Sequence, residues 1–249
     1  MEQVRVFALG GLDENGKNML VVEVDNKIYI IEAGLKYPDT DQLGVEFIIP
    51  DFTYLIENKE RIQGIFITHA HDDVVAALPY LLKQIKVPVF TGALTANIIH
   101  EMLKKEKIKD VKIHRLKRSS QQTIGGVKIR TFAMTHAYPD TFGIAILTSQ
   151  GYIVYTGEFI VDYDMLQKEY RCDINELSEI GKRGVLCLLS ESQGVERSGH
   201  TAPHHRITSL IEPIFEKSAG RILISCYHQS LFRIIEIIEL VKKEKKKIF

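Results

Sequence analysis

The stretch Thr68-His69-Ala70-His71-Asp72-Asp73-Val74 directly follows the apolar run Gly64-Ile65-Phe66-Ile67. It holds two histidines one residue apart, and a carboxylate follows two positions after the second histidine. Because the apolar run is typical of a buried strand, we expect these polar side chains where that strand ends. Imidazole nitrogens and carboxylate oxygens are the atoms by which proteins hold Zn²⁺ or Mn²⁺. The stretch therefore predicts a metal site at the end of a strand.

Three further apolar runs end in a residue of the same chemical kind. Glu32 follows residues 28–31, His136 follows residues 132–135, and Glu158 follows residues 153–157. Since the carboxyl ends of strands in an α/β sheet collect ligand groups, we expect these side chains beside the two histidines. The alternative is that His69 and His71 form hydrogen bonds within a loop and that Glu158 caps a helix.

The bulk composition excludes several classes of protein. The 249 residues allow one large domain or two small ones, and 32 basic residues balance 32 acidic ones, so no net charge points to nucleic acid. No apolar run is long enough to span a bilayer, and Met1-Glu2-Gln3 leads directly into a strand pattern without a signal peptide. Cys172, Cys187 and Cys226 are too scattered for a disulfide framework or a cysteine zinc site. We expect a soluble cytoplasmic protein without a membrane contact.

The order of local patterns predicts an α/β fold. Strands are expected over residues 4–9, 19–24, 27–32, 64–68, 87–91, 111–116, 127–132, 142–148, 152–155, 184–189 (buried) and 221–226, and helices over 74–85, 93–107, 204–217 and from about 231. Hairpins come first, and strands then alternate with helices, which is typical of sheets with helices packed outside them.

These motifs, in this order, resemble the metallo-β-lactamase superfamily, and specifically its ribonuclease J branch, which carries an inserted β-CASP domain. The matching segments are 8–12 (ALGGL), 16–19 (GKNM), 31–35 (IEAGL), 49–55 (IPDFTYL), 77–82 (ALPYLL), 135–136 (TH), 139–143 (PDTFG), 155–159 (YTGEF) and 188–192 (LLSES). The resemblance covers essentially the whole chain and is greatest to the diverged second paralogue of Firmicutes. It implies an αββα sandwich over residues 1–185 and the start of a β-CASP domain over 186–249. Because the remaining motifs would lie beyond Phe249, we expect a truncated chain.

The resemblance also implies two metal ions joined by a shared carboxylate. His69, His71 and His136 fall on the ligands of the first metal, and Glu158 stands where the bridging Asp does. Asp73 falls on a ligand of the second metal, and with the metal-bound water it is the expected catalytic pair. Glu32 occupies the position of an acid that steadies a metal-bound histidine.

Four positions depart from the family pattern. Val74 replaces the last histidine of His-x-His-x-Asp-His, and Glu replaces Asp at positions 32, 158 and 191. Three imidazoles and a carboxylate can still hold one Zn²⁺, or Mn²⁺, whereas two carboxylates make a weak second site. We therefore expect one metal ion and impaired two-metal chemistry.

The last quarter of the chain holds weaker candidates. Glu191 and Ser192 resemble the first β-CASP site motif, and Arg197 and Arg233 are candidate RNA phosphate contacts, with surface ion pairing as the alternative. His200, His204 and His205 are interpreted as a surface cluster near a helix start.

For function, the resemblance implies a metal-dependent ribonuclease with 5′-to-3′ exonuclease and endonuclease activity in mRNA decay and rRNA processing. The alternatives are a weak single-metal hydrolase, a non-catalytic subunit that positions an active ribonuclease J, and a truncated product with no stable role. RNA and a second copy or an active paralogue are the expected partners.

Overall fold

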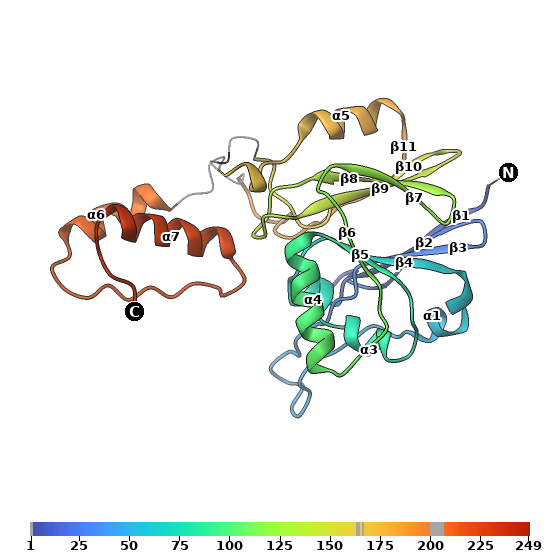
Figure 1. Ribbon diagram of the computed structural model, residues 1–249, viewed down its shortest axis with the longest axis horizontal. Coiled ribbons are helices and arrows are strands. Elements are labelled where there is room, and N and C mark those ends of the chain that lie inside the picture. Colours follow the sequence, from blue (N-terminus) through green and yellow to red (C-terminus); the bar gives the residue numbers. More distant parts are fainter. Residues whose placement is uncertain (1, 163–164, 166, 200–206) are drawn as a thin grey trace.

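The computed structural model describes residues 2–162, 165, 167–199 and 207–249, and two β-sheets form its centre (Figure 1). The first sheet contains, in spatial order, β1 (Val4–Gly10), β2 (Met19–Val24), β3 (Lys27–Ile31), β4 (Ile62–Ile67), β5 (Val89–Thr91) and β6 (Ile113–Arg115). The first three strands pair antiparallel, with a two-residue turn between β2 and β3 and a longer loop, residues 11–18, between β1 and β2. Strands β3 to β6 pair parallel. The carboxyl ends of β3 and β4 therefore open at the same edge, where the predicted ligands begin.

The second sheet continues the chain in the order β11, β10, β9, β8, β7. Its strands are β7 (Ser120–Ile124), β8 (Val127–Ala133), β9 (Phe142–Thr148), β10 (Gly151–Tyr155) and β11 (Val185–Leu189). The first four form an antiparallel meander, and β11 adds to β10 in parallel.

Apolar side chains of alternating strand positions fill the space between the sheets. Tyr29 and Phe66 from the first sheet belong to one buried cluster with Phe142 and Ile144 from the second. Burial of each such side chain stabilises the fold by about 1.5–3 kcal/mol. The sheets therefore cannot separate without exposing the core of the protein.

Helices cover the outer face of each sheet. The helices are α1 (Thr53–Glu57), α2 (Asp72–Val75), α3 (Leu78–Leu82) and α4 (Ala93–Lys105), packed on the first sheet, and α5 (Ile174–Lys182), packed on the second. Leu81 and Ile99 pack against the first sheet, and Ile180 against the second. These layers confirm the predicted αββα sandwich.

The predicted helix over residues 74–85 is two short helices instead. Pro79 is the second residue of α3, and its ring would clash with the carbonyl of Val75 in a continuous helix. Pro is well tolerated in a first helical turn, so the helix restarts at Leu78.

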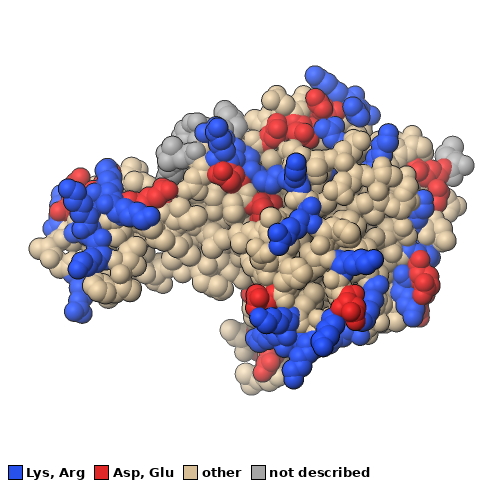
Figure 2. Space-filling view, viewed as in Figure 1, with Lys and Arg blue, Asp and Glu red and all other residues tan. Residues whose placement is uncertain are grey.

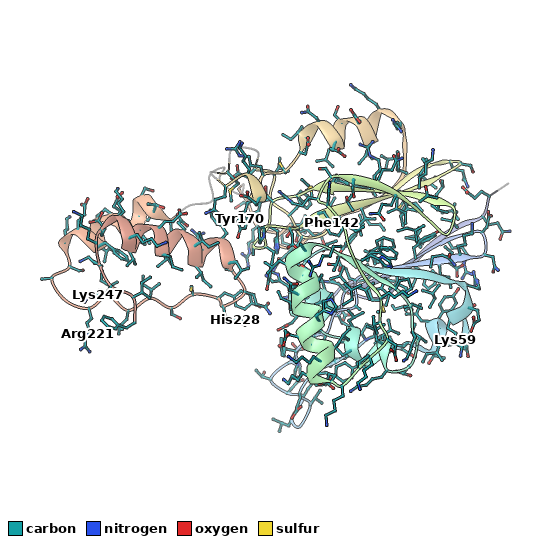
Figure 3. The ribbon with its side chains drawn as sticks, in the orientation of Figure 1. Lys59, Phe142, Tyr170, Arg221, His228 and Lys247 are labelled. Atoms are coloured by element: carbon teal, nitrogen blue, oxygen red, sulfur yellow. The ribbon has the colours of Figure 1, made fainter. Side chains whose placement is uncertain are left out.

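The last part of the chain forms a helical pair, α6 (Thr208–Lys217) and α7 (Leu231–Lys243), beside the sandwich. Figure 3 labels Arg221 on the connection between the two helices, Lys247 beyond the end of α7, and His228 on the side of the pair that faces the sandwich. The histidines at 200, 204 and 205 lie outside the described residues. No helix among the described residues is long and apolar enough to cross a membrane.

Two predictions about strands late in the chain are corrected, the burial of one strand and the existence of another. The strand over residues 184–189 forms, but it is an edge strand with exposed side chains, and Leu188 is 62% exposed rather than buried. Residues 221–226 form no strand, and Leu223 is 94% exposed. A strand requires a hydrogen-bonded neighbour, and the described residues offer none to this segment. The division into residues 1–185 and 186–249 stays a prediction.

Candidate metal centre

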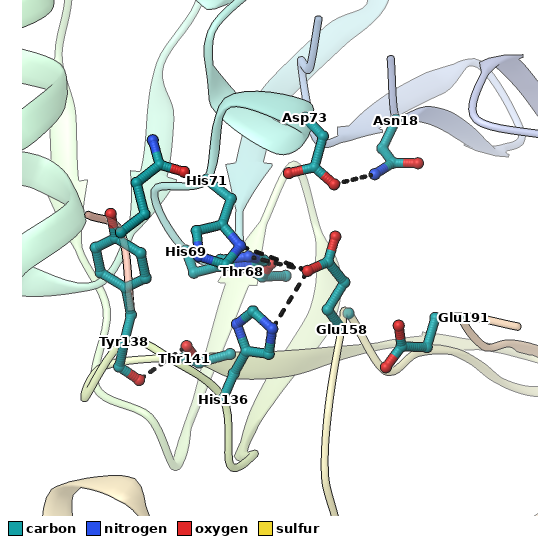
Figure 4. Close-up of polar contacts among 12 residues, drawn as sticks. Asn18, Thr68, His69, His71, Asp73, His136, Tyr138, Thr141, Glu158 and Glu191 are labelled. Atoms are coloured by element: carbon teal, nitrogen blue, oxygen red, sulfur yellow. Dashed lines mark hydrogen bonds and ion pairs between the residues drawn. The ribbon is translucent and has the colours of Figure 1, made fainter. Parts of the chain in front are cut away.

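Three histidines and one carboxylate converge where β4, β8 and β10 end (Figure 4). His69 and His71 lie between β4 and α2, His136 follows β8, and Glu158 follows β10. One ligand atom from each of the four residues lies within 4.8 Å of all the others. Glu158 Oε2 is 3.6 Å from His69 Nε2, 3.5 Å from His71 Nδ1 and 3.3 Å from His136 Nε2.

These distances fit a single tetrahedral cation. Ligand atoms that bind Zn²⁺ at about 2.0–2.1 Å lie about 3.3–3.4 Å apart. His69 Nε2 is buried and has no hydrogen-bond partner among the described residues. A buried polar atom of this kind normally has a partner, and a cation among the four side chains supplies one. The added methylene of Glu158, compared with the family's Asp, does not keep its carboxylate from the histidines.

A buried hydrogen-bond chain orients His69 from behind. The Thr68 hydroxyl donates to Glu32 Oε1 at 2.6 Å. The hydroxyl oxygen of Thr68 also lies 2.9 Å from His69 Nδ1. Because the hydroxyl proton is directed to Glu32, Nδ1 is the protonated nitrogen and donates to the Thr68 oxygen. Nε2 therefore carries its lone pair toward Glu158, as metal binding requires. The contact between Glu32 and His69 thus runs through Thr68, and the supporting role of Glu32 stays a prediction.

The electrostatics of the cluster favour a neutral His69 beside an ionised Glu158. Burial, with the neighbouring His136, lowers the pKa of His69 to about 3. Burial opposes ionisation of Glu158, but the three imidazoles that face it, His136 first, hold its pKa well below the usual range. Neutral imidazole and ionised carboxylate are the forms that bind metal ions.

The side of the site that contains Asp73 differs from the histidine side. Asp73 Oδ2 accepts a hydrogen bond from Asn18 Nδ2 at 3.2 Å, and Asp73 is not one of the four converging donors. Burial and the Glu158 carboxylate raise the pKa of Asp73 to about 8. Val74 is fully buried and offers no ligand atom.

The remaining predicted site residues lie in different surroundings. Glu191 Oε1 accepts the backbone N–H of Phe159 at 2.7 Å, directly after Glu158, while Ser192 is exposed. Arg233 forms an ion pair with Glu236, and Arg197 is exposed on a turn. RNA contact by either arginine stays a prediction.

The sequence did not single out Thr68, Asn18 or two tyrosines near the site. Thr68 directly precedes His69, which was the available signal. Tyr138 and Tyr227 have ring centroids 5.2 Å and 6.0 Å from that of His71, and no sequence pattern links these positions.

Comparison with known proteins identifies the superfamily. Residues 44–175 match the family model described as "Beta-lactamase superfamily domain". With the αββα sandwich and the histidine cluster, this match shows that the chain belongs to the metallo-β-lactamase superfamily.

Within that superfamily its relatives include the Ribonuclease J 2 proteins, which confirms the resemblance. It is 39% identical over 248 residues to Ribonuclease J 2 of Staphylococcus saprophyticus and 38% identical to that of Staphylococcus aureus strain MRSA252. Each match covers 99% of this chain and 44% of the relative, so the chain spans less than half the length of these relatives. The fold is also that of a crystal structure of a protein of unknown function from Enterococcus faecalis V583. That match has a TM-score of 0.68 and 14% identity, and it covers 96% of this chain and 63% of that one.

Proposed function

We propose that this chain is the metal-binding part of a ribonuclease J-like protein that hydrolyses RNA phosphodiester bonds in RNA degradation or processing. The observation that carries the proposal is the convergence of His69, His71, His136 and Glu158 on one point. The Ribonuclease J 2 relatives support RNA as the substrate. Exonuclease and endonuclease action in the cytoplasm is part of the proposal.

The proposed chemistry assigns different tasks to the two sides of the site. A bound Zn²⁺ or Mn²⁺ would polarise a water molecule and a phosphate oxygen. The three imidazoles and Glu158 hold the ion, and Thr68 with Glu32 fixes the tautomer of His69. Asp73, whose pKa of about 8 lies near neutral pH, exchanges a proton with the attacking water at its carboxyl oxygen.

Two exposed tyrosines support an RNA ligand. Tyr37 donates a hydrogen bond to Asp72 Oδ2 at 2.8 Å, and Tyr227 lies against His71. Both rings are more than half exposed. Aromatic rings beside a phosphate site are typical stacking surfaces for bases of single-stranded RNA. Figure 2 shows Lys and Arg interspersed with Asp and Glu on the face it displays. The support for an RNA ligand therefore comes from the histidine cluster and the tyrosines and not from the charge of that face.

We further propose that the site holds one metal ion and that turnover is weak, because Val74 stands where a second set of ligands needs a histidine. The second candidate function is a non-catalytic subunit that binds an active ribonuclease J or a second copy of itself. The exposed apolar side chains of Leu188, Leu210 and Leu223, in the proposed β-CASP portion over residues 186–249, favour this candidate.

The test combines metal analysis with an RNA decay assay on the protein in its natural length. We expect about one Zn or Mn per chain and slow, metal-dependent decay of 5′-monophosphorylated RNA. His71→Ala should remove both, with His100→Ala, an exposed histidine on α4, as the matched control. Metal binding without any decay would favour the partner-subunit function, and absence of bound metal would contradict both the metal centre and hydrolysis.

A further inference from the structure

His136 lacks the side-chain support that orients His69. Its Nε2 faces Glu158 Oε2 at 3.3 Å, but its Nδ1 is buried without a hydrogen-bond partner among the described residues. The direction of this ring therefore depends on the backbone of the loop that carries it, residues 134–141 between β8 and β9.

Arg118 spans the base of that loop. It lies three residues beyond the end of β6, and its guanidinium donates only to backbone carbonyls in the contacts that the structure records. Nε donates to Thr141 O at 3.0 Å, Nη2 to Met134 O at 2.6 Å and Arg171 O at 2.8 Å, and Nη1 to Lys168 O at 3.4 Å.

The four carbonyls belong to two segments that must stay in register. Met134 and Thr141 are the two ends of the His136 loop, and the Met134 N–H also donates to Thr141 O at 3.3 Å. Lys168 lies two residues before Tyr170 and Arg171 directly after it, and the Tyr170 carbonyl accepts the Thr135 hydroxyl. Arg118 therefore closes the base of the loop and ties it to the segment before α5.

These four hydrogen bonds, which point in different directions, require a guanidinium. Its planar fork presents five N–H donors in fixed directions, whereas a lysine ammonium is one compact point with three donors. Burial lowers the pKa of Arg118, and the negative charge of Asp140, in the same loop, opposes that effect. Asp140 itself accepts the N–H groups of Leu94 and Thr95 at the start of α4, so the loop is fixed on that side as well.

We propose that Arg118 is a positioning residue for the metal centre, which holds the backbone of residues 134–141 so that His136 Nε2 faces Glu158. This inference rests on the proposed metal site, and it assigns the role to a residue about which neither the motifs nor the ligand set says anything.

The test compares Arg118→Lys and Arg118→Gln with Arg115→Gln as the control. Arg115 is a nearby exposed arginine whose guanidinium bonds only one side chain among the recorded contacts, that of Asn97. Zn²⁺ affinity would be measured by chelator competition, well below the lowest melting temperature of the set. Both Arg118 variants should bind Zn²⁺ about 10–100-fold more weakly, as for other residues that support a metal ligand. Arg115→Gln should match the wild type.

A second readout separates positioning from general stability. In the metal-free proteins, imidazole NMR signals of His136 should shift or broaden in Arg118→Lys, while those of His69 should stay in place. Folded Arg118 variants with wild-type Zn²⁺ affinity and unchanged His136 signals would overturn the proposal, even if they melted earlier. If the wild type itself bound no Zn²⁺, the metal site would fail, and the metal-free His136 signals would still decide the role of Arg118.

Discussion

The two sides of the candidate site differ in how many side chains point at a common centre. On one side, three imidazoles and Glu158 point at a common centre, and Thr68 with Glu32 fixes His69. On the other side, Asp73 binds the side-chain amide of Asn18, and the next residue is a buried valine. The four converging side chains could hold one cation, and our proposal of a single metal ion rests on this difference between the two sides.

The difference lies in side chains and not in the backbone. The Asn18 N–H donates to Asp73 O at 3.0 Å, and the Ala33 N–H donates to Val74 O at 2.7 Å. Gly34 packs so closely on this turn that a Cβ there would lie 1.6 Å from the Asp73 carbonyl oxygen. The turn that would present a second set of ligands is therefore intact, which makes the comparison testable by single substitutions.

The largest effect is expected from removing an imidazole on the complete side. His71→Ala leaves two histidines and Glu158, and we expect Zn²⁺ affinity to fall by more than about 100-fold, the upper end of what loss of a supporting residue costs. Chelator competition on the purified protein measures this change. An affinity within about threefold of the wild type would show that the four side chains do not share one ion.

A smaller effect is expected from cutting the support of His69. Thr68→Val removes the hydroxyl between His69 and Glu32, so Zn²⁺ affinity should fall by about 10–100-fold. Leaving the buried Glu32 with fewer donors should also reduce the free energy of unfolding by about 1–3 kcal/mol. Thr91→Val is the matched control, because the Thr91 hydroxyl is equally buried and donates to Ile67 O at 2.8 Å. Equal losses of metal affinity in both variants would contradict the specific role of Thr68.

The sequence predicts the four ligand residues better than the residues that hold them in place, and the reason is physical. The apolar run before His69 and the runs before His136 and Glu158 are local patterns, and the ends of strands in neighbouring positions bring their ligands together. Glu32 was expected as a supporting acid from the resemblance, but its contact with His69 through Thr68, and the contacts of Arg118, join segments that lie far apart in the chain. No periodicity records such contacts, so Thr68 and Arg118 became visible only in the structure.

Strand errors have the same origin. β7 contains Gln121 and Gln122, whose side chains are exposed, and its strand state comes from pairing with β8 and not from an apolar pattern. The residues of β11 are apolar enough to be interpreted as buried, but the strand lies at the edge of its sheet. Burial and pairing are decided by neighbours, which a local pattern does not contain.

Restoring a ligand on the incomplete side should raise metal stoichiometry rather than affinity at the first site. In Val74→His, we expect the number of metal ions bound per chain to rise above one when Mn²⁺ or Zn²⁺ is in excess. The reason is that the backbone turn that carries residue 74 is already in place. Burying an imidazole without metal should lower the free energy of unfolding by about 1–3 kcal/mol, and added metal should restore it. Val74→Ala is the control and should stay near one ion. If Val74→His still bound one metal ion per chain, the valine would not be the reason that this side holds no second ion.

The smallest effect on metal binding is expected from Asp73→Asn, which should keep Zn²⁺ affinity within about threefold of the wild type, since it leaves the four converging donors intact. Its effect should appear in the pH dependence of metal-free stability instead. The pKa of Asp73 is raised to about 8 from 3.8, so the folded state binds this proton more tightly and loses the advantage as pH rises through that window. The melting temperature of Asp73→Asn relative to the wild type should therefore increase between about pH 4 and pH 8 and level off above it. A constant difference across that range would mean that Asp73 ionises normally and that the two carboxylates do not share the buried space beside the histidines.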